Sequence, residues 1–378
     1  MKSNIYSYTL PALLFSSTIS VAGTGFISPN GTGNGYSIDK PASINSVNTL
    51  LSDPNLDTIK LMPGTYIQED AIYLRGGSHD IQVIGDEQVI FSGDYNFTPE
   101  GNAGFVIARS NISFENLQFL NTRYCFRFKN YNVTNVKIDK ITAHNTMSCI
   151  DFDSNITATV ENIVVNNVKS LGYFKSGVRI NGKTPRNISI TNSIFDALAS
   201  SSEETKSCHI TGISVSGFVE DILIKNVTIT NNIGAITNCG EYQQGDGVMV
   251  NADASNVSIV NTVVGNSKDA DFDIKGKNTT LLDVTSLSGK EARYNMKLWN
   301  NDFTCKNCYI HIANINAIQA IDAKVNFMNS TFKVNDHIEI CDLRNYTDAI
   351  SSVTFANSHY SSYGELSIIP EHVDNCIK

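Results

Sequence analysis

After its first 22 residues the sequence has no apolar run long enough to cross a bilayer, for which a helix needs about 20 apolar residues. Positive charge is also scarce, because 28 lysines and arginines stand against 37 aspartates and glutamates, and the formal net charge is -9. Proteins that bind nucleic acid usually have the opposite balance. We therefore expect no membrane span and no nucleic-acid partner. An acidic polymer remains compatible with the charge, since a local cationic groove or a bound divalent ion can reverse the field.

The first residues have the pattern of a secretory signal. Lys2 precedes an apolar stretch from Leu10 to Val21, and the small residues Ala22 and Gly23 follow. A membrane anchor is the alternative, but serine and threonine interrupt the stretch and it is too short for a span. We predict a signal peptide over residues 1–22 and a secreted mature chain, either extracellular or periplasmic.

Short units that begin with asparagine recur along the chain, each with a β-branched residue, a serine or threonine and an apolar residue. They begin at Asn111, Asn132, Asn155, Asn187, Asn256 and Asn278, with Asp221 in the gap after Asn187. Steps of 21 to 35 residues are typical of a coil whose turns carry loops of different lengths. Asparagine suits the bends of such a coil, because it tolerates left-handed backbone geometry and can form side-chain ladders.

A second set of segments has the same rhythm and alternates apolar with polar or variable residues, which is the period of a half-buried strand. The segments begin at Cys125, Cys149, Gly177, Gly212, Gly247, Asp271 and Asn295. Stacked turns would place their apolar residues in two internal columns. One column is Val178, Ile213, Val248, Phe272 and Met296, and the other is Ile180, Val215, Val250, Ile274 and Leu298.

Coiling is the simplest topology for these segments, because no amphipathic helix long enough for a crossover separates them. We predict an all-β protein with a right-handed parallel β-helix. A β-sandwich is the alternative, but the Asn-Gly and Asp-Gly turns of its hairpins are mostly missing. A short helix from Ser43 to Leu51 would cap one end and the segment from Ser367 to Lys378 the other. No linker divides residues 23–378, which we expect to form one domain.

Eight cysteines, an even number in an exported chain, predict disulfides. Cys125 and Cys149 are the preferred pair, because they lie 24 residues apart and would stack on adjacent turns. Cys305 and Cys308 form a CxxC motif. A metal or redox interpretation of it is weak without a second CxxC or a strand–helix context.

The chemistry is expected where aspartates alternate along one predicted strand. Asp269, Asp271 and Asp273 would face one side of it, where three carboxylates repel one another unless a cation lies between them. Calcium suits such an irregular oxygen site better than magnesium. Asp246, 23 residues before Asp269, would add a ligand from the preceding turn, so all four aspartates are predicted metal ligands. The alternative is a solvated acidic surface with Lys275 as counter-charge.

Lys297 lies 24 residues after Asp273 and would be its lateral neighbour, about one strand spacing of ~4.8 Å away. A lysine close to a cation and shielded by Trp299 has its charged form disfavoured, and can then serve as a base near neutral pH. The carboxylate of Asp273 opposes this effect unless a metal neutralises it. Metal occupancy and the basicity of Lys297 are therefore coupled in this interpretation.

Three runs around these residues carry a family resemblance. Gly245-Asp-Gly-Val, Asn266-Ser-Lys-Asp-Ala-Asp-Phe-Asp and Asn295-Met-Lys-Leu resemble the calcium-binding and catalytic turns of family 9 polysaccharide lyases, which are pectate lyases on a parallel β-helix. The resemblance covers residues 245–300, about a seventh of the chain. It implies Asp246, Asp269 and Asp273 as calcium ligands and Lys297 as the base. Ala270 stands where the family has a second aspartate, and Asp271 where it has a glycine.

The reaction that this resemblance implies is β-elimination on a polymer of uronic acid, such as polygalacturonate. Calcium bound to the sugar carboxylate would acidify the neighbouring C5 proton, and Lys297 would remove it. Arg179, Lys275 and Arg293 are candidates for binding substrate carboxylates. The expected partner is an acidic polysaccharide, and the protein is expected to be a monomer.

Two other functions fit the same fold. A β-helix hydrolase would need paired carboxylates, and the Gly-His-Gly and Arg-Ile-Lys signatures of polygalacturonases are absent. A non-catalytic carbohydrate-binding or surface protein with structural calcium is the second alternative, since fold alone does not assign function.

Overall fold

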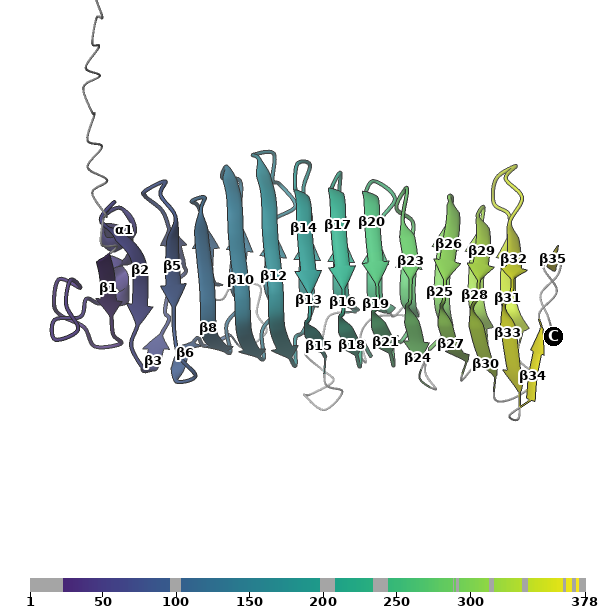
Figure 1. Cartoon of the computed structure of the whole chain (residues 1–378), viewed down its shortest axis with the longest axis horizontal. Helices are drawn as coiled ribbons and strands as arrows, with labels where there is room; N and C mark the ends of the chain where they lie inside the picture. Colours follow the sequence, from purple (N-terminus) through teal and green to yellow (C-terminus); the bar gives the residue numbers. More distant parts are fainter. Residues whose placement is uncertain are drawn as a thin grey trace, which may run out of the picture.

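The computed structural model describes residues 23–95, 103–197, 208–233, 244–287, 289, 292–312, 316–334, 339–362, 365–368 and 372–373. The predicted signal peptide, residues 1–22, lies outside this part. Within it, parallel strands stack turn upon turn into one long row, which confirms the predicted parallel β-helix (Figure 1). No helix of the described residues is long and apolar enough to cross a membrane.

One sheet of the coil has 11 strands and takes one strand from each turn. In spatial order they are β4 (Ile72–Leu74), β7 (Ala103–Ile107), β9 (Tyr124–Phe128), β11 (Ser148–Phe152), β13 (Ser176–Ile180), β16 (His209–Val215), β19 (Gln244–Val250), β22 (Ala270–Ile274), β25 (Tyr294–Trp299), β28 (Asn316–Ile321) and β31 (Glu339–Arg344). We call it the site sheet, because all the predicted site residues that carry charge lie on it or next to it.

The remaining 24 strands form the second sheet, which we call the wide sheet. Its longer row is β1 (Gly23–Ile27), β2 (Leu56–Leu61), β5 (Ile81–Ile84), β8 (Ile112–Leu120), β10 (Val133–His144), β12 (Val160–Leu171), β14 (Arg186–Thr191), β17 (Glu220–Lys225), β20 (Ser255–Val260), β23 (Thr280–Leu282), β26 (Asp302–Lys306), β29 (Lys324–Met328), β32 (Ser352–Ala356) and β35 (His372–Val373). Its shorter row is β3 (Gly64–Ile67), β6 (Val89–Ser92), β15 (Ile194–Asp196), β18 (Thr228–Thr230), β21 (Val263–Gly265), β24 (Thr285–Leu287), β27 (Tyr309–Ile312), β30 (Thr331–Val334), β33 (His359–Ser362) and β34 (Glu365–Ile368). β8, β10 and β12 are long enough to run through both rows.

Asparagines occupy the bends of the coil, as the sequence predicted. Asn111 and Asn187 have positive φ angles and belong to a ladder in which the side-chain amides of Asn135, Asn162 and Asn187 each donate to the asparagine of the preceding turn. In two units the bend lies later than predicted, at Asn135 and Asn162 instead of Asn132 and Asn155. In the first of these units the β-branched residues lie in β10, whereas in the second Ile156 and Thr157 come before β12, so the pattern did not locate the residue that turns.

The interior of the coil is a continuous apolar core, and both predicted columns are present. Val178, Ile213, Val248, Phe272 and Met296 pair laterally in register, and so do the members of the second column. All are buried. Side chains from neighbouring turns therefore stack at one strand spacing, and this register also fixes the side chains on the outer face.

Both ends of the row are covered. The predicted N-terminal helix is present as a 3-10 turn, η1 (Ile44–Ser46), followed by α1 (Val47–Leu51), which buries Val47, Leu50 and Leu51 against the first turn. At the other end β34 and β35 pair antiparallel with β33 and β32 (Figure 1). The rest of the predicted closing segment lies outside the described residues.

The disulfide pairing of the cysteines differs from the prediction. Cys125 and Cys149 lie on adjacent strands as expected, but both are buried free thiols. Laterally stacked residues lie about one strand spacing apart, ~4.8 Å, which is wider than the Cβ separation of about 3.8 Å in a disulfide. Cys305 and Cys308 are joined instead, across the corner between β26 and β27.

Candidate functional site

Six of the eight predicted site residues meet on the outer face of the site sheet, all except Asp271 and Arg179. Asp246 on β19 pairs with Ala270 on β22, and Asp273 pairs with Lys297 on β25. Asp269 lies directly before β22. Three turns thus place Asp246, Asp269, Asp273 and Lys297 in one cluster, which we call the acidic cluster. All four are at least nine-tenths buried.

Direct contacts hold this cluster together. The Lys297 ammonium lies 2.8 Å from Asp269 Oδ2. Trp299 donates its indole N–H to Asp273 Oδ1 at 2.8 Å, and its ring centroid lies 5.6 Å from the Lys297 ammonium. Asp246 accepts the backbone N–H of Ala270. The aromatic ring and the neighbouring turns therefore shield the charges from water.

Burial and the closeness of the carboxylates shift the pKa values of the acidic cluster. Burial, followed by the charges of Asp273 and Asp269, raises the pKa of Asp246 well above the ordinary value. Burial lowers the pKa of Lys297, but the nearby carboxylates outweigh it and the net pKa is raised. Lys297 is therefore a protonated partner of Asp269 in this arrangement, and it becomes a base only if something else neutralises the carboxylates.

Asp271 does not belong to the acidic cluster, so its predicted place beside Asp269 and Asp273 is wrong. Its side chain turns inward and accepts a hydrogen bond from Ser286 on the opposite sheet at 2.6 Å. The strand departs from simple alternation here, because both Asp271 and Phe272 face the interior. Burial raises the pKa of Asp271 to about 7, although hydrogen bonds from Ser286 and Ser267 oppose the rise.

The three predicted carboxylate-binding residues separate into two places. Lys275 lies 3.0 Å from Asp273 Oδ2, and the Arg293 guanidinium lies 3.9 Å from Asp269 Oδ1 at the more exposed rim. Both are thus at the acidic cluster. Arg179 is on β13, three strands away, where it pairs with Asp151 at 2.6 Å.

The acidic cluster offers three nearly buried carboxylates, which are the kind of oxygen ligand that calcium prefers, and the ionised form of one of them, Asp246, is disfavoured. Asp273 Oδ2 is buried and, despite its 3.0 Å approach to Lys275, accepts no well-directed hydrogen bond. As arranged, no three His, Cys, Asp or Glu side chains of the described residues converge closely enough to hold one ion. Lysine ammoniums lie against two of the carboxylates instead, so a cation would have to displace them.

The sequence interpretation missed a second group of charges on the same face, around Arg127, Asp151 and Lys175. The spacing of charged residues along the sequence could have indicated this group. The run Lys175-Ser-Gly-Val-Arg179 places two charges four residues apart, as Asp269-Ala-Asp-Phe-Asp273 does, and the two runs occupy equivalent strands.

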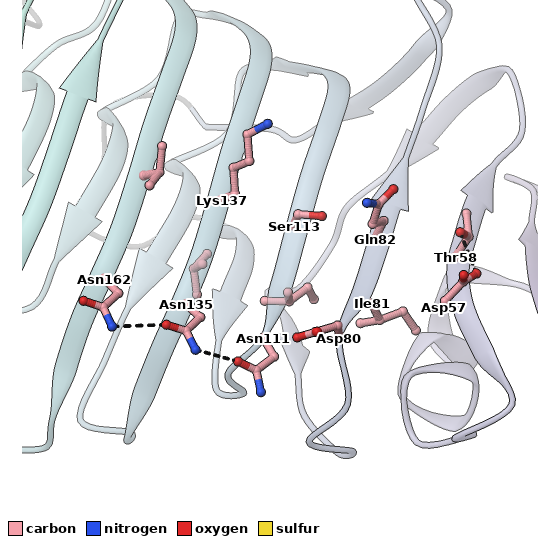
Figure 2. A pocket seen from close by; sticks show the side chains of 13 residues that line it. Asp57, Thr58, Asp80, Ile81, Gln82, Asn111, Ser113, Asn135, Lys137 and Asn162 are labelled. Atoms are coloured by element: carbon pink, nitrogen blue, oxygen red, sulfur yellow. Dashed lines mark hydrogen bonds between the residues drawn. The ribbon is translucent and has the colours of Figure 1, made fainter. Parts of the chain in front are cut away.

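A groove of about 660 Å³ lies elsewhere, on the outer face of the wide sheet near the N-terminal end. The ladder of Asn111, Asn135 and Asn162 runs along its edge (Figure 2). Its other lining residues include Asp57, Thr58, Asp80, Gln82, Ser113 and Lys137. None of the predicted site residues lines it, so the acidic cluster is a site on a strand face, separate from this groove.

No protein-family model matches the sequence, and no curated protein matches it either. Among solved structures, a lacto-N-biosidase from Eubacterium ramulus is similar with a TM-score of 0.54 and 10% identity, over 90% of this chain and 68% of that one. Pectate lyase Pel9A is similar with a TM-score of 0.47 and 13% identity, over 90% of this chain and 80% of that one. PfbA, a surface adhesin of Streptococcus pneumoniae, has a TM-score of 0.48 and 13% identity, over 91% and 99%. At these identities the likenesses show the fold alone.

Proposed function

We propose that this protein is a secreted, monomeric polysaccharide lyase that cleaves a uronic acid polymer such as polygalacturonate by calcium-assisted β-elimination. The observation that carries the proposal is the position of one buried lysine among three buried aspartates, with the Lys297 ammonium 2.8 Å from Asp269 Oδ2. The resemblance of residues 245–300 to family 9 polysaccharide lyases supports the same assignment.

Each residue of the acidic cluster has a distinct role in this proposal. Asp246, Asp269 and Asp273 would hold calcium, which supplies a Lewis acid for the substrate carboxylate when it is bound. Lys297, once released from Asp269 and after its ammonium has given a proton to water, would remove the C5 proton of the sugar. The electron pair of the C5–H bond would form the new C4–C5 double bond, and the glycosidic oxygen would leave from C4 and take up a proton from water. Lys275 and Arg293 lie at the edge of the cluster and would bind neighbouring carboxylates of the polymer.

A non-catalytic carbohydrate-binding protein is the second candidate, and one observation favours it. The net pKa of Lys297 is raised, because the carboxylates outweigh burial, so without a cation the lysine stays protonated. In that case the cluster would bind sugar and calcium without removing a proton. The two candidates differ in whether product is formed and in whether its formation needs Lys297.

The test follows unsaturated product by ultraviolet absorbance, with polygalacturonate and other uronans, in calcium and in chelator. We expect product only with calcium. Lys297→Ala should lower the rate by about 10²–10⁴-fold, the usual contribution of a general base. Lys225→Ala, on the exposed outer face of the wide sheet, is the matched control and should leave the rate unchanged. Binding of a uronan without product favours the second candidate, and full activity of Lys297→Ala refutes the proposed mechanism.

A further inference from the structure

Four cationic side chains gather at β9 and β13 of the site sheet, closer to the N-terminal end of the coil than the acidic cluster. Arg123 lies directly before β9 and Arg127 on it, and Lys175 lies directly before β13 and Arg179 on it. We call these four residues the basic cluster. All are half-buried.

Two carboxylates only partly neutralise the basic cluster. Asp151 on β11 is buried between two arginines, 2.6 Å from Arg179 Nε and 3.3 Å from Arg127 Nε, and Asp153 lies 3.1 Å from Arg127. Four positive charges against two negative charges leave a net charge of +2. The ring of Tyr124 lies beneath Arg123 and Arg127, with the guanidinium carbons 5.3 and 4.7 Å from its centroid. The arginines are therefore held in place as a fixed, positively charged surface.

Lys175 and Arg123 are the two cations of this cluster that lack an acidic partner. Among the described residues no Asp or Glu forms an ion pair with either of them, and the buried Nε–H of Arg123 donates no hydrogen bond. Burial and the positive charges of Arg179 and Arg123 lower the pKa of Lys175, although Asp151 opposes them. A half-buried ammonium among like charges would be stabilised by an anion from outside the chain.

The register relates the basic cluster to the acidic cluster. Arg179 pairs with Ser214, Ser214 with Met249 and Met249 with Asp273. Ser176 and Ala270 occupy the same position of the strand on turns that are three apart. Lys175 directly precedes Ser176 and Asp269 directly precedes Ala270, so these two charged residues are also equivalent. The same two columns thus change from positive to negative over three strand spacings, roughly 14 Å at ~4.8 Å each. Between Arg179 and Asp273, their shared column carries the uncharged side chains of Ser214 and Met249.

We infer that the basic cluster binds a sugar carboxylate of the same acidic polysaccharide whose cleavage is proposed at the acidic cluster, with the polymer lying across the strands along the axis of the coil. This inference rests on the proposed function. Guanidinium and ammonium groups match carboxylates in charge and geometry. A pyranose ring has a length comparable to one strand spacing, so a few sugars would span Ser214 and Met249. A chain of this length reaches both clusters, whereas a short oligomer reaches one.

The test measures calorimetric binding of oligogalacturonate trimer and heptamer in calcium, on a Lys297→Ala background so that the oligomers are not cleaved. Lys175→Ala should weaken heptamer binding about 10-fold, as expected for a lost hydrogen bond between charged groups. It should change trimer binding by less than about 2-fold, because the trimer occupies the acidic cluster, and Lys175→Arg should retain heptamer binding. Lys169→Ala, exposed on the wide sheet, is the matched control.

Equal heptamer affinity of Lys175→Ala and its parent overturns the inference and leaves the proposed function intact. A protein that binds no oligogalacturonate of either length overturns both. A sulfated oligosaccharide of the same length serves as the comparison, because a sulfate group would suit the same cations. Tighter binding of the sulfated oligomer than of the heptamer, lost in Lys175→Ala, would assign the basic cluster to a different anion and overturn the carboxylate assignment.

Discussion

Replacing Lys297 by methionine tests the electrostatics of the acidic cluster without any assumption about catalysis. Methionine keeps an unbranched side chain of similar size but removes the ammonium that lies 2.8 Å from Asp269. Three buried carboxylates then remain with Lys275, whose side chain is 26% exposed, and with the more distant Arg293. Without calcium, we expect Lys297→Met to be clearly less stable than the parent protein.

The magnitude follows from the burial of the pair. Removing one partner of a buried ion pair costs about 3–5 kcal/mol, because the other charge stays buried and uncompensated. For 378 residues the unfolding entropy is roughly 0.8 kcal/mol/K, at about 2.1 cal/mol/K per residue. The expected fall in Tm in chelator is therefore about 4–6 °C.

Calcium should reverse most of this loss. At a free concentration of about 100 times its Kd, an ion that binds the folded state adds about 2.7 kcal/mol of stability, or roughly 3 °C here. The gain should be larger in Lys297→Met than in the parent, because in the parent the ion must displace the lysine from Asp269. Thermal unfolding followed by circular dichroism in chelator and in calcium measures both quantities, with Lys225→Met as control. A fall below about 1 °C, or an equal effect of calcium on both proteins, would refute the reasoning.

Two further predictions concern individual aspartates. In chelator at neutral pH, Asp246→Asn should raise Tm, because the raised pKa of Asp246 makes its ionised form unfavourable in the folded state. The folded state then holds the proton of Asp246 more tightly than the unfolded state does. The gain in Tm from Asp246→Asn should therefore shrink as the pH falls towards the ordinary carboxyl range. A gain in Tm that grows as the pH falls would contradict the raised pKa of Asp246. Asp273→Asn should weaken calcium binding in calorimetry about 10-fold or more, whereas Asp271→Asn, inside the core, should leave the affinity within about 2-fold, since an electrostatic ligand is lost only in the first. Equal effects of the two substitutions would place Asp271 back among the ligands.

The fold could be predicted from the sequence because a coil repeats its own register. Val248 and Phe272 had to face inward if the strand period was 2, and the stacking of turns then fixed their lateral neighbours. The exact bends were less accessible. Asn132 and Asn135 have the same chemistry, and only the position of the turn in three dimensions decides that Asn135 adopts the left-handed conformation.

The site could be predicted only as far as simple alternation holds. Lys297 and Asp273 are lateral neighbours because their strands are in register, which spacing alone indicated. Asp271 could not be placed in this way, because both it and Phe272 turn inward and its partner Ser286 comes from the opposite sheet. The predicted disulfide between Cys125 and Cys149 is wrong for a related reason. The register that makes these two residues lateral neighbours also keeps their side chains about one strand spacing apart.

The inward turn of Asp271 and the presence of Ala270 change what the acidic cluster can do. The outer face carries three carboxylates, and Lys297 and Lys275 already compensate two of them. A cation therefore gains less from binding here than at a set of carboxylates without lysines, because it must compete with ammonium groups for Asp269 and Asp273. Under the proposed function the same competition would release the Lys297 ammonium from Asp269, and the charge of the calcium ion beside it would favour loss of its proton to water. Calcium binding and the appearance of a proton acceptor would then be a single event, and activity should follow calcium occupancy across its whole titration.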